Sequence, residues 1–119
     1  MNTETSTRVL ILEHAEEDIE LLCYELKKGG LQYISEIVET RETFAKALTD
    51  FQPDIVLSDY SLPTFDGVSA YNLKQQLRPD IPFIIVSGTI GEENAVELIK
   101  KGVTDYVLKD KLFTIIPKI

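Results

Sequence analysis

Residues 54–67 read DIVLSDYSLPTFDG, and this stretch decides the fold. It is apolar at every position from 55 to 57, reaches Asp59, and continues into a loop rich in turn-forming residues. A short run without polar interruptions is typical of a strand buried on both faces, as in a parallel sheet covered by helices. The stretch therefore predicts a central strand whose carboxyl end presents an aspartate to a loop.

The rest of the chain alternates between β-rich runs of this kind and longer segments of helical periodicity. Strands are expected at residues 8–13, 35–39, 54–59, 82–87 and 105–108. The run at 35–39 is shorter and more polar than the others, so it is expected at an edge of the sheet. Alternating strands and helices joined by right-handed crossovers predict an α/β protein of (βα)5 type, a doubly wound five-stranded parallel sheet with helices on both faces.

The predicted helices are recognised by apolar residues at helical spacing and by residues typical of helix ends. Thr40 is expected to cap one helix, and Gly29 and Gly102 are expected to end two others. Near residue 119, Pro117 fits only a first helical turn, which Thr114 would cap. The positions expected to face inward are Ile19, Leu22, Cys23, Leu26, Phe44, Ala47, Leu48, Phe51, Ala70, Leu73, Leu77, Ala95, Leu98, Ile99 and Gly102.

Length, charge and cysteine content argue against several classes of protein. A chain of 119 residues fits one domain, so we expect a single domain over residues 1–119, with its last helix cut short. There are 20 acidic against 12 basic side chains, and the net charge of −8 argues against nucleic-acid binding. The single cysteine, Cys23, forms no intramolecular disulfide, which favours a cytoplasmic location. No signal peptide and no membrane span are expected, because no apolar run is long enough.

Chemically capable side chains gather where the predicted strands end. Taken alone, Asp59 fits a helix or loop cap, Ser87 a turn residue and Lys109 a solvated surface lysine. In a doubly wound sheet, however, these positions share one edge with Glu13 and His14. Carboxylates that face one another need a cation or a proton, and a hydroxyl beside an ammonium suits a phosphate. The sequence has no glycine-rich nucleotide loop and no paired zinc motif, so a site for a cation and a phosphate is the remaining interpretation.

Four features make the sequence similar to a known family over essentially its whole length. They are Glu13 after the first strand, LSDYSLPTFDG at 57–67, VSGT at 86–89 and DYVLKD at 105–110. Together they resemble the response regulator receiver domain, the phosphoacceptor module of two-component signalling. The resemblance implies the flavodoxin-like strand order 2-1-3-4-5. The longer stretch from 86 to 110 is also similar to receivers attached to sensor histidine kinases with PAS modules.

The resemblance implies a role for each residue at the strand ends. Asp59 would accept a phosphoryl group from a phosphohistidine, and Ser87 and Lys109 would hold its oxygens. Mg²⁺ would be held by Glu13, Asp59 and the backbone carbonyl of Ser61.

The resemblance also implies a switch and a set of partners. Tyr106 is at the position of the family's switch aromatic, expected to turn inward when Ser87 moves toward the phosphoryl group. The expected partners are a histidine kinase or phosphotransfer protein and an effector or kinase domain further along the same chain. Such a domain is a signalling phosphoacceptor and not an enzyme.

His14 departs from the family pattern, which usually has a second acid at this position. Mg²⁺ prefers oxygen to imidazole nitrogen, and a cationic imidazole among Glu13, Asp59 and Glu17 would compete with the metal, so weak Mg²⁺ binding is expected. The main alternative is therefore a degenerate receiver that acts as a protein-interaction module without phosphorylation. An aspartate phosphatase of the haloacid dehalogenase type is a remote alternative, because it needs an acid where Ser61 stands.

Overall fold

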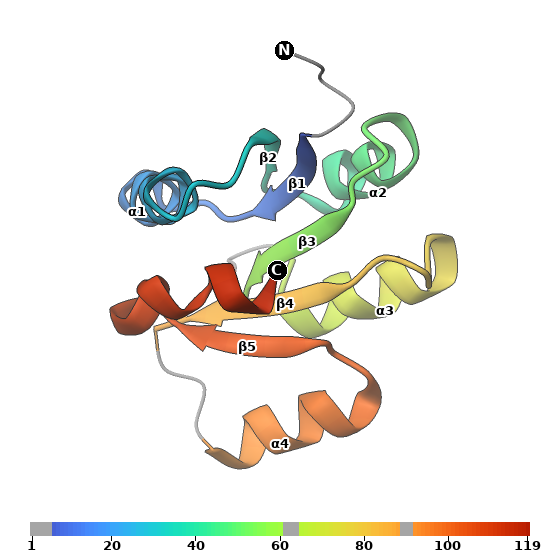
Figure 1. The fold of residues 1–119 in the computed structure, drawn as a ribbon. Helices are drawn as coiled ribbons and strands as arrows, with labels where there is room; N and C mark the ends of the chain where they lie inside the picture. Colours follow the sequence, from blue (N-terminus) through green and yellow to red (C-terminus); the bar gives the residue numbers. More distant parts are fainter. Residues whose placement is uncertain (1–5, 61–64, 89–91) are drawn as a thin grey trace.

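Five parallel strands form one sheet in the order β2-β1-β3-β4-β5 (Figure 1). The computed structural model describes residues 6–60, 65–88 and 92–119. The predicted strand order and (βα)5 alternation are confirmed, and no strand boundary differs from the predicted one by more than two residues. The strands are β1 (Thr7–Leu12), β2 (Tyr33–Val38), β3 (Ile55–Asp59), β4 (Phe83–Ser87) and β5 (Asp105–Leu108). The helices are α1 (Glu16–Lys28), α2 (Arg41–Asp50), α3 (Gly67–Leu77) and α4 (Glu92–Lys101), followed by the 3-10 segments η2 (Lys109–Thr114) and η3 (Ile116–Lys118).

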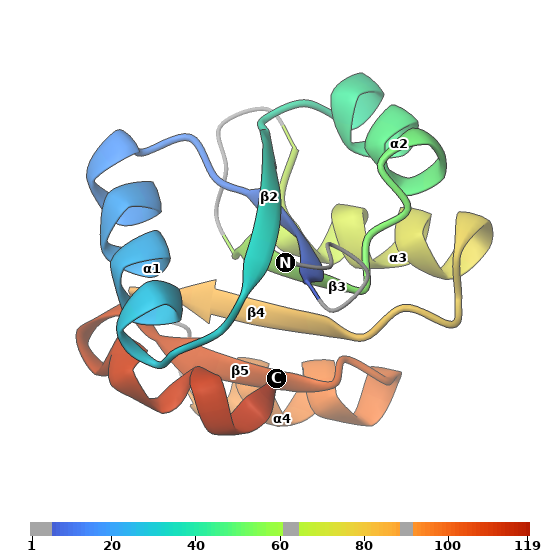
Figure 2. The same ribbon diagram turned by 45° about the horizontal axis from the view of Figure 1, so that its top comes forward.

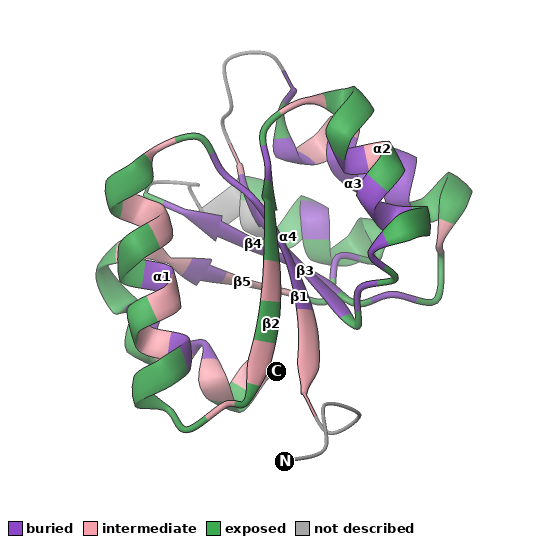
Figure 3. Ribbon diagram, turned by 90° about the horizontal axis from the view of Figure 1, so that it is seen from above, coloured by how far each residue is buried: buried purple, intermediate pink, exposed green. Residues whose placement is uncertain are grey.

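Helices cover both faces of the sheet, and the central strands supply apolar side chains to each face (Figures 2 and 3). Along β1, Leu10 and Leu12 pack into the core beneath α2, α3 and α4. Val9 and Ile11 point the other way, into the core beneath α1 and η2. This alternation explains why the central runs are apolar throughout: successive side chains meet different helices, and neither face reaches water.

Two of the helix ends behave as their residues predict. The Thr40 hydroxyl accepts a hydrogen bond from the backbone N–H of Thr43 at 3.2 Å, and the Thr43 side chain accepts in return from the N–H of Thr40. This reciprocal cap confirms Thr40 as the start of α2. Gly102 ends α4 with a φ of +112°. Gly29 closes α1 in a right-handed conformation, and the left-handed residue is Gly30, one position later.

The sequence-based prediction placed several side chains too deeply or in the wrong role. Leu77 and Ile99 are 42% and 41% exposed, because Leu77 is the last residue of α3 and α4 lies beside the edge strand β5. Cys23 is half-buried against the core beneath α1. The hydroxyl of Thr114 donates to the carbonyl of Lys111 and caps no helix. The segment after β5 forms 3-10 turns that bury Ile115, with Pro117 in the first turn of η3.

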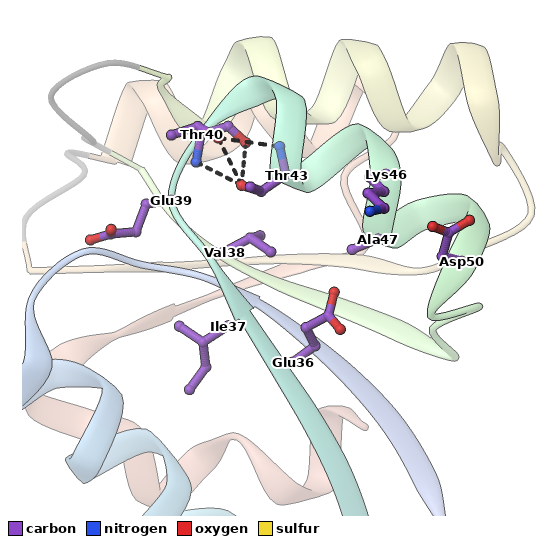
Figure 4. A pocket seen from close by; sticks show the side chains of 9 residues that line it. All are labelled: Glu36, Ile37, Val38, Glu39, Thr40, Thr43, Lys46, Ala47 and Asp50. Carbon is purple, nitrogen blue, oxygen red and sulfur yellow. Dashed lines mark hydrogen bonds between the residues drawn. The ribbon is translucent and has the colours of Figure 1, made fainter.

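The strand β2 lies at one edge of the sheet, as its polar composition predicts. Its side chains Ile34 and Ile37 are exposed. A groove of about 500 Å³ runs between β2 and α2 (Figure 4). Glu36, Glu39 and Asp50 line this groove together with one ammonium, from Lys46, and none of the residues singled out at the strand ends reaches it.

Gly102 provides a test of the turn that leads into β5. A Cβ at this position would collide with the hydroxyl of Tyr71, which donates a hydrogen bond to the carbonyl of Lys101 at 2.8 Å. We expect Gly102→Ala to lower the free energy of unfolding by about 2–3 kcal/mol, from positive φ and steric overlap together. Gly30→Ala is the control, since its φ is +82° but the space around it is open, and it should cost about 1 kcal/mol. Equal losses in urea unfolding would show that the overlap with Tyr71 contributes nothing.

Candidate functional site at the carboxyl edge of the sheet

The strand register brings the predicted site residues together at one edge. Glu13 follows Leu12, and Asp59 follows Ser58, which is the register partner of Leu12. On the other side of Asp59, Ser87 ends β4, and its register partner Leu108 is followed by Lys109. The clustering expected from the parallel sheet is therefore present in the structure.

Lys109 is the centre of the cluster. Its ammonium lies 2.8 Å from Oε2 of Glu13, 2.7 Å from Oδ2 of Asp18 and 3.4 Å from Oδ1 of Asp59. Burial alone would lower the pKa of Lys109, but hydrogen bonds to Asp18 and Glu13 and the charges of Glu13 and Asp59 raise it above its ordinary value. The ammonium is therefore charged throughout the physiological pH range.

Glu13 is held in place by the backbone that leads into α1. Its Oε1 accepts hydrogen bonds from the N–H groups of His14 at 2.9 Å and Ala15 at 3.1 Å. Its second oxygen accepts from Lys109, and the whole residue is buried. These contacts fix both oxygens of the Glu13 carboxylate beside Asp59.

Asp59 is buried at the end of β3, and the N–H of Tyr60 donates to its Oδ1 at 2.9 Å. Burial and the nearby charge of Glu13 raise the pKa of Asp59, and the opposite effect of Lys109 does not cancel them. Burial and the charge of Glu13 thus destabilise the ionised form of Asp59, and a further cation nearby would stabilise it. This is the physical condition expected of a carboxylate that binds a metal ion.

The ligand types near Asp59 suit Mg²⁺ in part. One ligand atom from each of Glu13, His14 and Asp59 lies within 4.8 Å of the others. The two carboxylates are ligands that Mg²⁺ prefers, whereas the imidazole is not. The backbone carbonyl of Ser61, the other predicted ligand, lies outside the described residues.

His14 lies at the rim of the cluster, with its side chain 42% exposed and its Nδ1 3.4 Å from Oε1 of Glu13. Glu17, expected beside it, is exposed, and the α1 acid that reaches the cluster is Asp18. The contact between Asp18 and Lys109 was not predicted from the sequence. The only signal was the place of Asp18 in the acidic first turn after Glu13, and that turn does not reveal which carboxylate points inward.

Ser87 lies at the end of β4 and Tyr106 lies in β5, as the resemblance implies. Ser87 is buried at the end of β4. Tyr106 on β5 is half-buried and packs against the core beneath α2, α3 and α4. A switch that couples Ser87 to Tyr106 stays a prediction.

The fold matches that of solved receiver-domain structures. In the solved complex of CheX with CheY, BeF₃ and Mg²⁺ from Borrelia burgdorferi, one chain shares the fold with a TM-score of 0.82 at 19% identity, over 99% of this chain and 91% of that one. The family model described as the response regulator receiver domain matches residues 9–116. The chain belongs to this family, whose members are the phosphoacceptor modules of two-component signalling and bind Mg²⁺ at the phosphorylation site.

Curated relatives are named as transcriptional regulators. The phosphate regulon transcriptional regulatory protein PhoB of Klebsiella pneumoniae is 27% identical over 104 residues, covering 86% of this chain and 44% of that protein. The transcriptional regulatory protein YvcP of Bacillus subtilis is 34% identical over 104 residues, covering 86% of this chain and 42% of that protein. The chain thus spans less than half the length of these relatives. Among the described residues, no helix has the length and apolar character needed to cross a bilayer.

Proposed function

We propose that Asp59 is the phosphoacceptor of this receiver domain. The observation that carries the proposal is the position of the buried Asp59 carboxylate, 3.4 Å from the Lys109 ammonium and beside Glu13. Ser87, at the end of the neighbouring strand, is proposed to donate a hydrogen bond to a phosphoryl oxygen.

In the proposed reaction, an oxygen of Asp59 forms a bond to phosphorus as the bond from phosphorus to the donor histidine nitrogen breaks. The donor imidazole keeps the electron pair of that bond and takes up a proton. Aspartate is a weak nucleophile, so the rate depends on positioning and on neutralising the transferred oxygens. Lys109 supplies one positive charge, and Glu13 and Asp59 would hold Mg²⁺, which supplies two more when bound.

The proposed partners follow from this chemistry. The donor is a histidine kinase or a phosphotransfer protein, and the output is an effector or kinase domain further along the same chain. The domain would act as a cytoplasmic signalling phosphoacceptor and not as an enzyme with a substrate of its own. Two further statements stay predictions. One is that the domain is a receiver of the kind attached to PAS-containing kinases, and the other is that residues 1–119 form a single domain with its last helix cut short.

Incubation with acetyl phosphate or phosphoramidate tests the proposal directly. With Mg²⁺ present, intact-mass analysis should show the gain of one phosphoryl group, and chelation of the metal should prevent it. No gain with either donor at any Mg²⁺ concentration would refute the proposal and favour the degenerate receiver, which binds partners without phosphorylation.

His14 is proposed to weaken the metal site, and its replacement by an acid tests this. His14→Asp adds a carboxylate beside Glu13 and should tighten Mg²⁺ binding about tenfold and speed phosphorylation by small donors. Because the chain has no tryptophan, the affinity is measured by NMR shifts or by metal-dependent thermal stability. His14→Asn is the control, since it removes the imidazole without adding charge. Equal Mg²⁺ affinity in wild type and His14→Asp would contradict this role.

A further inference from the structure

Asp18 forms the shortest contact in the cluster, although the family resemblance gives it no role. Its Oδ2 accepts a hydrogen bond from the Lys109 ammonium at 2.7 Å, across 91 residues of sequence. The Asp18 side chain is 32% exposed and that of Lys109 is 19% exposed, so the pair is only partly screened by water. Asp18 belongs to the first turn of α1, and the contact therefore links this helix to the residue that follows β5.

The ammonium of Lys109 has three hydrogen atoms to donate, and three carboxylates surround it. Glu13 and Asp18 accept at hydrogen-bond distance, while Asp59 is the most distant at 3.4 Å. If Asp18 were absent, Glu13 and Asp59 would be the remaining carboxylate partners of Lys109. The ammonium, which already contacts Glu13, would then shift toward Asp59 and occupy the carboxylate that suits a divalent cation.

We propose that Asp18 is a positioning residue that holds the Lys109 ammonium near Asp59 without a hydrogen bond to it, and so leaves the Asp59 carboxylate accessible to Mg²⁺. This inference rests on the proposed function for the role of Mg²⁺ and Lys109. Asp18 keeps the ammonium close enough to meet a phosphoryl group on Asp59, yet provides it with a partner that the metal does not use.

The charge balance of the cluster supports this role. Three carboxylates and one ammonium leave two net negative charges, which one Mg²⁺ cancels. Without Asp18 only one negative charge would remain. Asp18 thus restores, from α1, the acidic charge that the family pattern usually has at the position of His14.

Substitution of Asp18 should weaken Mg²⁺ binding more than the loss of one nearby charge explains. We expect Asp18→Asn to lower the Mg²⁺ affinity about fivefold to tenfold, measured by NMR titration. Glu17→Gln removes the same charge from the same turn at an exposed side chain, and should lower the affinity only about twofold. Asp18→Glu, which keeps the carboxylate, should recover most of the affinity. Equal losses in Asp18→Asn and Glu17→Gln would overturn the proposal.

A double-mutant cycle shows whether Asp18 acts through Lys109 or attracts the metal directly. In a Lys109→Met background, Asp18→Asn should lower the Mg²⁺ affinity no more than Glu17→Gln does, because no ammonium remains to be held. A loss of the same size in both backgrounds would overturn the proposal, since Asp18 would then act on Mg²⁺ without Lys109.

A measurement without metal or phosphorylation separates this proposal from the proposed function. In ¹⁵N NMR of the lysine side chains, the Lys109 ammonium should exchange its hydrogens slowly in wild type and faster in Asp18→Asn. An unchanged Lys109 signal would overturn the positioning role even if phosphorylation proceeds normally. A changed signal and a changed Mg²⁺ affinity would support the positioning role even if acetyl phosphate fails to modify Asp59.

Discussion

Exchange of Asp59 for asparagine is expected to abolish uptake of the phosphoryl group altogether. The amide has no carboxylate oxygen to attack phosphorus, and the other acids of the cluster are engaged: Glu13 by two backbone N–H groups and Lys109, and Asp18 by Lys109. Intact-mass analysis after treatment with acetyl phosphate and Mg²⁺ measures the effect.

Asp110→Asn is the matched control for this loss. Asp110 is exposed and follows Lys109 directly, so its exchange changes the local charge but no residue of the proposed site. It should leave phosphorylation within about twofold of wild type. Undiminished phosphorylation of Asp59→Asn would mean that another carboxylate is the acceptor.

Removal of the Lys109 ammonium should lower the stability of the fold strongly. Lys109→Met leaves the buried carboxylates of Glu13 and Asp59 facing each other without a cation, and should lower the free energy of unfolding by about 2–3 kcal/mol at pH 7. Urea unfolding measures the loss. Lys109→Arg, which keeps the charge, should retain most of the stability.

The pH dependence of this loss has a defined sign. The pKa of Asp59 is already raised by burial and by Glu13, and removal of Lys109 raises it further. A carboxyl group with a raised pKa costs no stability when it is protonated, and it becomes destabilising as the pH rises through the folded value. The deficit of Lys109→Met should therefore shrink on acidification and grow toward neutral pH. A deficit that is the same from pH 4 to pH 8 would show that lost packing, and not charge, is the cause. Asp59→Asn in the same background should recover part of the stability.

In the wild-type protein, the raised pKa of Lys109 affects the stability at alkaline pH. The stability it contributes is fully present below the ordinary lysine pKa of 10.5 and is lost as the pH rises through the higher value of the folded state. Both groups therefore reduce the stability as the pH rises, Asp59 in the acidic range and Lys109 in the alkaline range.

The sheet could be predicted because its signals are local and strong. The apolar runs at β1, β3 and β4 have no polar position to turn toward water, so a parallel sheet with two covered faces is the structure that fits them. Helix periodicity was less informative about how deeply each helix residue is buried. It indicates which side of a helix faces inward, but not how far the sheet extends beneath it, and for this reason Leu77 and Ile99 were wrongly placed inside.

Some features of the candidate site could likewise be predicted from the sequence, and others could not. Parallel strands place their carboxyl ends at one edge, so the gathering of Glu13, Asp59, Ser87 and Lys109 followed from topology. The contact between Asp18 and Lys109 depends on the rotation of α1 and on two flexible side chains, and neither is encoded in residue spacing. The resemblance to receiver domains could not supply it either, because it concerns the positions that the family shares.

The edge strand β2 exposes the protein to aggregation. Ile34 and Ile37 are branched aliphatic residues on a strand that ends the sheet, a combination that can recruit the strands of other molecules into intermolecular β-structure. Glu36 and Glu39 flank Ile37 and act as charged gatekeepers, because carboxylates on neighbouring molecules repel one another.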